Sequence, residues 1–455
     1  MISRLRFANF KSWARADVQF APITTVFGTN SSGKTSLLQL LLLLKQTKDA
    51  TDRAIALELN GDLVELGTMG DVLHNHDLRR TLEIDIEIGL RKKLSLTDPG
   101  SRPTATVADG DTLRMRSEVI VNREAPVARH LEYQLGDRSF GLIPQSGDLP
   151  QFRLVTGATG HASTPFQFTR SPGRPSRLPG PVKSYAFPDQ ARTQFQNAGF
   201  LADLEAAYEA ALDRTYYLGP MRHNPQRDYL WGRSSPSDVG QRGEKTIDAI
   251  LAKTEAGELQ NLRWRGRLRP FQEVIAHWLR ELGLVASFKI EELAKGSNRW
   301  QARVKTTESS SEVLLTDVGF GVSQVLPVVT LLHYVPEGST VLLEQPELHL
   351  HPLAQAALAD VIAHAALHRR VQVILESHSE HLLLRLQRRI AEGTVRAKDA
   401  KMYFCELDEG ASQLTELHVD LYGNIRNWPP RFMGDAFGET AKAEIARLQR
   451  METQG

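Results

Sequence analysis

The chain has 455 residues, of which 41% are hydrophobic and 24% charged, a composition typical of a soluble globular protein with two or three domains. A net charge of +1 excludes a protein-wide basic field for nucleic acid, so such binding would need a local patch. The single cysteine, Cys405, excludes an internal disulfide framework. The N-terminus lacks a signal-peptide core, and the leucine run 37–44 is too short to span a membrane. We therefore expect a cytoplasmic protein with no membrane segment.

The N-terminal region predicts two or three strands, the last of them the β-branched run 23–27. Residues 28–35 follow this strand and read GTNSSGKT, which fits the P-loop pattern G-x-x-x-x-G-K-[ST]. Residues 36–45 are leucine-rich and predict a buried helix. A strand, a glycine-rich turn and a helix form the context in which a P-loop binds phosphate.

The P-loop predicts ATP and Mg²⁺ as cofactors. Lys34 is expected to reach the β- and γ-phosphates, and the Thr35 hydroxyl is expected to bind Mg²⁺. The predicted nucleotide-binding residues of this segment are Gly28, Thr29, Asn30, Ser31, Ser32, Gly33, Lys34, Thr35 and Ser36.

The middle of the chain is less regular. Residues 63–73 predict a strand, a glycine turn and the start of a helix, and residues 82–88 alternate strictly, as a half-buried strand does. Similar short segments continue through 89–140 and predict an antiparallel β-rich insertion. Residues 141–190 are rich in Pro, Gly, Ser and Thr, which predicts a long or partly disordered loop. A helical pattern returns at 201–212.

Two arginine-containing segments follow. Residues 216–222 predict a short strand ending in a turn, where Arg222 faces a phosphate or forms a structural ion pair; a helix then opens at 240. Residues 263–269 place arginines at every second position. In an extended conformation these arginines share one face that could bind DNA or RNA. The alternative is a solvated basic loop, or one that pairs with acidic residues such as Glu291 and Glu292.

The C-terminal half predicts a second anion-binding turn and a carboxylate-tipped strand. Gly319, Gly321 and Ser323 precede an apolar helix at 325–332, and such a turn can bind an anion. The apolar run 339–343 ends in Glu344, Gln345 and, two residues on, Glu347. Glu344 is expected to bind Mg²⁺.

A neutral amide such as Gln345 can orient water but cannot take its proton. Glu347 could substitute for it as the base. A helix at 353–366 and a core strand at 371–375 follow, and His378 lies just after this strand. It is a candidate catalytic residue, with a core histidine as the alternative.

The segments FGTNSSGKTS, DVGFGVSQ, LLEQPELHLHP and ESHSEHLL, in this order, resemble the RecF/OLD/SMC branch of ABC-type ATPases. Within it the chain is most similar to bacterial proteins called AAA family ATPases. The tail 419–429 with Phe432 resembles a C-terminal domain of unknown function found on some of them. The resemblance covers about 1–75, 215–250 and 311–440, and leaves out the insertion.

The resemblance implies an α/β fold: a P-loop NTPase with an ABC-type ATPase head, a β-rich insertion and a short C-terminal cap. The expected regions are 1–88 and 311–400 for the head, 89–200 for the insertion, 201–310 for a connector and 401–455 for the cap. Ser323 and its neighbours would then contact the γ-phosphate held by a second subunit, so the resemblance implies an ATP-dependent homodimer. His378 would contact the γ-phosphate as a switch.

The expected function is an ATP-gated dimeric switch or sensor that acts on a separate effector protein, in bacterial anti-phage defence or DNA repair. One alternative is an ATP-binding scaffold that barely hydrolyses, because Gln345 stands where a catalytic base is usual. Another is the nucleotide-binding subunit of a transporter. The absence of a glutamine from 63–73, where such subunits carry a γ-phosphate sensor, weighs against this third reading.

Overall fold

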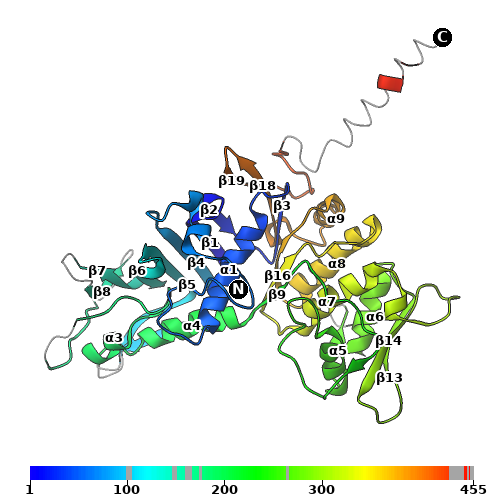
Figure 1. Ribbon diagram of the computed structural model, residues 1–455, viewed down its shortest axis with the longest axis horizontal. Coiled ribbons are helices and arrows are strands. Elements are labelled where there is room, and N and C mark those ends of the chain that lie inside the picture. Colours follow the sequence, from blue (N-terminus) through cyan, green and yellow to red (C-terminus); the bar gives the residue numbers. More distant parts are fainter. Residues whose placement is uncertain are drawn as a thin grey trace.

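The computed structural model describes residues 1–98, 105–145, 151–158, 166–173, 177–262, 266–429, 445–447 and 450. Its centre is a six-stranded sheet in the order β19-β18-β3-β17-β16-β9 (Figure 1). All but the edge strand β19 are parallel to their neighbours. The strands are β3 (Ile23–Gly28), β9 (Thr215–Leu218), β16 (Thr340–Glu344), β17 (Gln372–Glu376), β18 (Ala400–Asp408) and β19 (Ala411–Glu416).

The central sheet separates two hydrophobic cores. Every residue of β16 and β17 is buried, as expected for parallel strands covered on both faces. Because side chains alternate along a strand, Leu343 and Leu375 pack into one core while Leu342 and Ile374 pack into the other. Apolar runs without polar alternation therefore predicted these strands correctly.

One core lies under a second, antiparallel sheet of seven strands in the order β2-β1-β4-β5-β6-β7-β8. Helices α1 (Lys34–Asp49) and α4 (Leu201–Asp213) pack together in this half of the molecule. The strands are β1 (Ile2–Phe10), β2 (Trp13–Gln19), β4 (Leu82–Asp98), β5 (Ala105–Asn122), β6 (Ala125–Leu135), β7 (Arg138–Pro144) and β8 (Phe152–Ala158).

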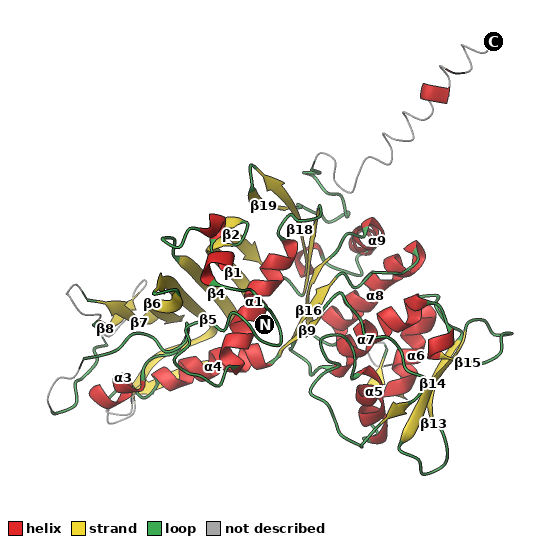
Figure 2. Cartoon of the chain, in the orientation of Figure 1, coloured by secondary structure: helices red, strands yellow, loops and turns green. Residues whose placement is uncertain are grey.

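The other core lies among helices on the opposite side of the central sheet (Figure 2). These helices are α5 (Thr246–Glu255), α6 (Phe271–Glu281), α7 (Phe320–Tyr334), α8 (Pro352–His368) and α9 (Glu380–Ala391). Small sheets cover them, formed by β10 (Tyr229–Leu230), β13 (Ser287–Glu292), β14 (Arg299–Lys305) and β15 (Val313–Leu314), and by β11 (Leu259–Asn261) with β12 (Leu268–Pro270). The short helices α2 (Met69–Val72) and α3 (Asp189–Gln194) lie outside this group.

The expected antiparallel strands of 89–140 are confirmed, but they do not form a sheet of their own. Strand β4 runs through the boundary expected at residue 88, and it pairs with β1 on one side and β5 on the other. The so-called insertion therefore extends the N-terminal sheet. The loop expected over 141–190 also contains β8; its stretches 146–150, 159–165 and 174–176 lie outside the described residues.

Three element predictions were wrong in detail. No strand forms at 63–66, where an isolated bridge joins Asn60 to Glu65, because the Gln46 side chain bonds the backbone of Val64 instead. The helix expected at 240 begins at Thr246, after turns with positive φ at two glycines. The helix expected at 325 begins earlier, at Phe320.

Candidate functional site

Three neighbouring parallel strands end at one edge of the central sheet. Strand β17 lies between β3 and β16, and Glu344 and Glu376 are register partners at the last position of their strands. Ligands of open α/β sheets bind at such carboxyl ends. The sheet therefore gathers the P-loop, the carboxylate of β16 and the turn after β17 around one site.

Lys34, the first residue of α1, is the central cation of this site. Its ammonium donates hydrogen bonds to the carbonyls of Gly28 (3.2 Å) and Thr29 (2.5 Å) and contacts the Ser32 hydroxyl at 3.5 Å. Lys34 is buried, with a relative exposure of 4%. It forms no ion pair within the described residues. Burial lowers its pKa, against the opposing charge of Glu376. A buried ammonium without a paired carboxylate fits the phosphate group that the P-loop pattern implies.

The P-loop is buttressed from outside. Gly33 caps α1 with a φ of 96°, and a Cβ there would lie 2.3 Å from Ser412 Oγ. The indole of Trp13 donates to the Gly33 carbonyl at 3.1 Å. The Cys405 thiol donates to the Ser32 carbonyl at 2.9 Å, and burial raises the pKa of Cys405 to about 11. The single cysteine thus packs as a neutral thiol against the P-loop.

Glu376 is a site residue that the sequence reasoning missed. The Thr35 hydroxyl donates to Glu376 Oε2 at 2.8 Å, although the sequence paired Thr35 with Glu344. The Glu376 carboxylate is 1% exposed, and the Gln345 side chain also hydrogen-bonds to it. Burial raises its pKa. The available signal was an apolar strand ending in a carboxylate, the same pattern that identified Glu344.

Glu344 is held by a tyrosine from the adjacent strand. Tyr217 Oη donates to Glu344 Oε1 at 2.8 Å. Burial, followed by repulsion from Glu376, raises the pKa of Glu344 to about 7. Two buried carboxylates and the Thr35 hydroxyl form an oxygen donor set of the kind that a hard divalent cation prefers. The residues present therefore fit Mg²⁺.

Gln345 and Glu347 are both fixed by the turn after β17. Gln345 has a positive φ of 42°, and its N–H donates to the Glu376 carbonyl at 3.1 Å. Glu347 Oε1 accepts from the Ser377 hydroxyl (2.8 Å) and the His378 N–H (2.7 Å). Its Oε2 is buried without a partner among the described residues, and burial raises the pKa of this carboxyl. Glu347 thus holds the loop that carries His378.

His378 lies beside the P-loop, because its ring interacts with the Gly28 backbone and with the charge of Lys34. Partial burial and then this charge lower the pKa of His378, so the ring is neutral near pH 7 and can both donate and accept. His378 therefore lies next to the P-loop, and its contact with a nucleotide stays a prediction.

Arg222 adds a second cation. Its Nη2 donates to the Glu344 carbonyl at 3.4 Å, while Nε and Nη1 are buried without a partner in the described part of the chain. Burial lowers its pKa to about 10. Among the described residues Arg222 forms no ion pair, which was the expected alternative, and its unpartnered N–H groups favour an anion.

The second anion-binding turn differs from the expected one. Gly319 caps α7, while Gly321 and Ser323 belong to its first turn rather than to a loop before it. The Ser323 hydroxyl donates to the Phe320 carbonyl at 2.9 Å. In the described part of one chain, the first turn of α7 and the P-loop are not joined by a hydrogen bond.

The basic stripe 263–269 is only partly described. Arg263, Trp264 and Arg265 lie outside the described residues, while Arg269 belongs to β12. Glu291 pairs with Lys289 and Arg303, so it does not neutralise the described part of the stripe. Phe432 of the tail also lies outside the described residues. No helix in the described ranges is both long and apolar enough to cross a membrane.

Family models match three parts of the chain. Residues 1–121 match "AAA ATPase domain", residues 307–385 match "AAA domain, putative AbiEii toxin, Type IV TA system", and residues 395–442 match "Protein of unknown function (DUF3696)". The two ATPase models contain the P-loop and the Glu344–His378 segment respectively. No curated protein matches the sequence.

Solved structures of SMC head domains are similar to this chain. One is an SMC head bound to the C-terminal winged-helix domain of ScpA (12% identity, TM-score 0.44, covering 92% of this chain and 98% of that chain). Another is the SMC head of Thermotoga maritima (9%, 0.41, covering 92% and 99%). A third is an SMC head with an extended coiled coil, bound to a C-terminal domain of ScpA, from Pyrococcus furiosus (12%, 0.41, covering 91% and 96%).

The P-loop, the carboxylate-tipped strand β16 and His378 meet at one sheet edge, in the order that the motifs follow along the chain. Two parts of the chain, 1–121 and 307–385, are therefore similar to AAA ATPase domains, and they lie in an α/β fold that carries a P-loop.

Proposed function

We propose that this protein hydrolyses Mg²⁺-bound ATP and uses the reaction as a switch between an open and a closed homodimer. The observation that carries the proposal is the buried, unpaired ammonium of Lys34 beside the Glu344–Glu376 carboxylate pair. One cation and two carboxylates suit the opposite charges of a phosphate and its metal ion.

Each residue has a defined role in this proposal. Lys34 and the P-loop N–H groups bind the phosphates, and Thr35 and Glu344 would hold Mg²⁺. When bound, Mg²⁺ would supply positive charge that offsets the negative charge of the phosphates. Tyr217 orients Glu344 through its 2.8 Å hydrogen bond, and Glu347 orients the His378 loop. His378 and Gln345 position the attacking water, and Glu376 accepts its proton.

The dimer follows from the separation of the two anion-binding features. The N-terminus of α7 carries positive partial charge and Gly319 leaves open space there, so the α7 turn of one copy can cap the phosphate that the P-loop of the other copy holds. An opening and closing dimer can signal to a separate effector protein. Anti-phage defence and DNA repair are the settings we infer from the resemblance of the motifs.

A second candidate function, an ATP-binding scaffold with little turnover, is favoured by one observation. Gln345 stands where a basic carboxylate is usual and donates to Glu376 rather than pointing freely to water. If Glu376 serves only the metal, the site has no base.

Phosphate release tests the proposed function. We expect steady-state release of phosphate from Mg²⁺-ATP by the wild type, and a fall to background for Lys34→Ala. The matched control is Lys45→Ala, which removes another lysine of α1. Equal rates for the wild type and Lys34→Ala would overturn the ATPase proposal and leave the scaffold.

Gln345→Glu separates the two candidates. Under the proposed function the variant should be no faster than the wild type, because a third carboxylate beside Glu344 and Glu376 is disfavoured by repulsion. A clear rise in phosphate release would instead show that the missing base limits the wild type, as the scaffold function requires.

A further inference from the structure

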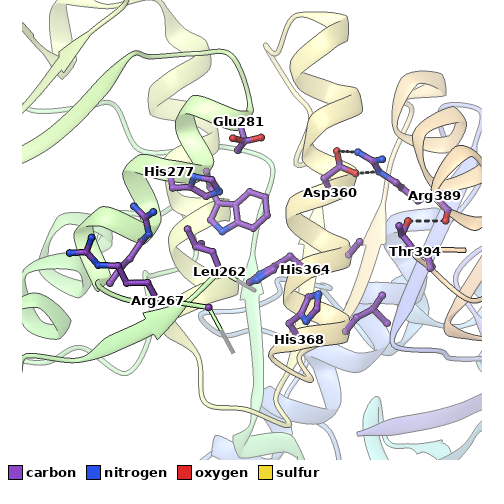
Figure 3. Close-up of a pocket in the computed structure, with 15 residues that line it drawn as sticks. Leu262, Arg267, His277, Glu281, Asp360, His364, His368, Arg389 and Thr394 are labelled. Atoms are coloured by element: carbon purple, nitrogen blue, oxygen red, sulfur yellow. Dashed lines mark hydrogen bonds and ion pairs between the residues drawn. The ribbon is translucent and has the colours of Figure 1, made fainter. Parts of the chain in front are cut away.

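A cavity of about 640 Å³ lies between α6, α8 and the end of α9 (Figure 3). None of the nucleotide-site residues lines it. Its volume falls within the range of about 300–1,000 Å³ that is usual for small-molecule sites. Helix α8 contributes Asp360, His364 and His368 from its C-terminal half, whereas the nucleotide site lies near its N-terminus. The cavity is therefore a separate site.

One wall of the cavity is aromatic. The rings of Trp278 on α6 and His364 on α8 lie 4.9 Å apart, and His364 and His368 lie 5.0 Å apart. Figure 3 shows the His364 side chain projecting from α8 toward Leu262. These rings are inclined to one another by 57° and 36°, and His364 also stacks on His333, so a planar ligand would contact only the ring surfaces that line the cavity.

The same wall holds polar atoms that lack partners. Trp278 and His364 are each 8% exposed. Trp278 Nε1 and both ring nitrogens of His364 have no hydrogen-bond partner within the described residues; the Leu262 backbone interacts with the His364 ring without normal hydrogen-bond geometry. Burial, and then His368, lowers the pKa of His364 to about 4, so the ring offers one donor and one acceptor. A buried donor or acceptor without a partner is unfavourable, which favours a ligand with its own donors and acceptors.

Positive charge lines the cavity as well. Arg267 and Arg269 take part in none of the ion pairs found in the described ranges. Of the two carboxylates in the lining, Asp360 already pairs with Arg385 and Arg389, and Glu281 is exposed. Free guanidinium groups beside an aromatic wall suit an anion attached to a ring.

We propose that this cavity is a second nucleotide-binding site, in which a base stacks on the Trp278–His364 wall and a phosphate meets Arg267 and Arg269. A nucleobase is planar and carries donors and acceptors on its edge, which the unpartnered indole and imidazole groups require. The site does not depend on the P-loop.

Calorimetric titration of the Lys34→Ala protein with AMP, GMP, CMP and UMP tests the proposal. Lys34→Ala removes the phosphate-binding cation of the P-loop, so its failure to hydrolyse ATP would not affect the result. We expect saturable binding of one molecule per chain for at least one of the four. Adding Arg267→Glu with Arg269→Glu should weaken this binding at least tenfold. Arg280→Glu, on an exposed position of α6 outside the lining, should leave it unchanged.

A second variant guards against misfolding. Trp278→Phe keeps an aromatic face and removes the unpartnered N–H, so it should weaken binding several-fold while leaving the thermal transition in place. The proposal is overturned if none of the four nucleotides binds, or if the charge-reversed protein binds as well as Arg280→Glu. Binding of an eight-residue oligothymidylate without any mononucleotide binding would also overturn it, in favour of a nucleic-acid surface.

Discussion

The Glu376 carboxylate accepts a hydrogen bond from Thr35 and lies beside Glu344 at the end of the adjacent strand. Glu376→Gln keeps the size of this side chain but removes the proposed proton acceptor. We expect phosphate release to fall by about 100-fold or more. Glu380→Gln, on an exposed position at the start of α9, is the matched control. A rate within twofold of the wild type would exclude Glu376 from the reaction.

Glu205 makes the stability of the folded protein depend on pH, and it does so independently of the nucleotide site. This residue of α4 accepts from the Phe187 N–H at 2.8 Å, and burial raises its pKa to about 7. The folded protein therefore holds the proton more tightly than the unfolded chain, and stability falls as pH rises from about 4.5 to 7. The side chain of Glu205→Gln cannot ionise. The free energy of unfolding of this variant should therefore fall less than that of the wild type over this pH window, and the difference between the two proteins should be up to about 3 kcal/mol.

Thermal denaturation at pH 5 and pH 8 measures this difference. Relative to Glu205→Gln, the wild type should lose stability between the two values. A parallel response of the two proteins would show that Glu205 ionises as it does in the unfolded chain.

At the scale of the elements, the close pairing of β3 with β18 leaves no space for a side chain at Gly28. Gly28 lies opposite Cys405, and a Cβ at Gly28 would lie 2.0 Å from the Cys405 carbonyl oxygen. The residue also has a φ of 150°, which side chains rarely adopt. Gly28→Ala should therefore lower the free energy of unfolding by about 2 kcal/mol or more.

The control for this prediction is Gly232→Ala, because a Cβ at Gly232 meets nothing within 4 Å. Chemical denaturation of both variants gives the comparison. Equal stability of Gly28→Ala and Gly232→Ala would show that the β3–β18 pairing can shift to admit a methyl group.

The sequence predicted elements wherever local pattern and burial agree. The runs that became β3, β16 and β17 are mainly apolar or β-branched, and they are buried on both faces of the sheet. The prediction of a strand at 63–66 was wrong because the side chain of Gln46 hydrogen-bonds to the backbone of Val64 in place of a partner strand. Sequence reasoning also missed that β4 joins β1, because pairing between remote strands leaves no local pattern.

At the nucleotide site too, features set by local spacing could be predicted from the sequence, whereas contacts between remote residues could not. The P-loop pattern and the position of His378 are readable from spacing, and the structure brings both to one sheet edge. The contact between Thr35 and Glu376 joins residues 341 positions apart. No spacing rule could specify that contact before the strand order was known.

At the scale of the whole molecule, mixing of variants tests the composite site. Lys34→Ala removes the phosphate-binding cation. Gly319→Asp keeps a good helix cap at α7 but places a negative charge where a phosphate would bind. Neither variant alone should release phosphate. In an equal mixture, half of randomly formed dimers contain one intact site, so about a quarter of the wild-type rate should return.

Size-exclusion chromatography with light scattering, with and without Mg²⁺-ATP, confirms that the mixture forms dimers. Melting curves of each variant alone serve as the folding control. If the mixture stays inactive although both variants are folded and dimeric, each chain must complete its own site.

The strand order also bears on how the protein is synthesised. Strand β3, which leads into the P-loop, has two neighbours in the sheet, β17 (Gln372–Glu376) and β18 (Ala400–Asp408). Although the P-loop leaves the ribosome early, its strand has no partner until the last quarter of the chain has been translated. Contacts this remote form late in folding. A nascent chain that has not yet reached residues 372–408 would therefore lack both neighbours of β3, and we expect its P-loop not to form a nucleotide site.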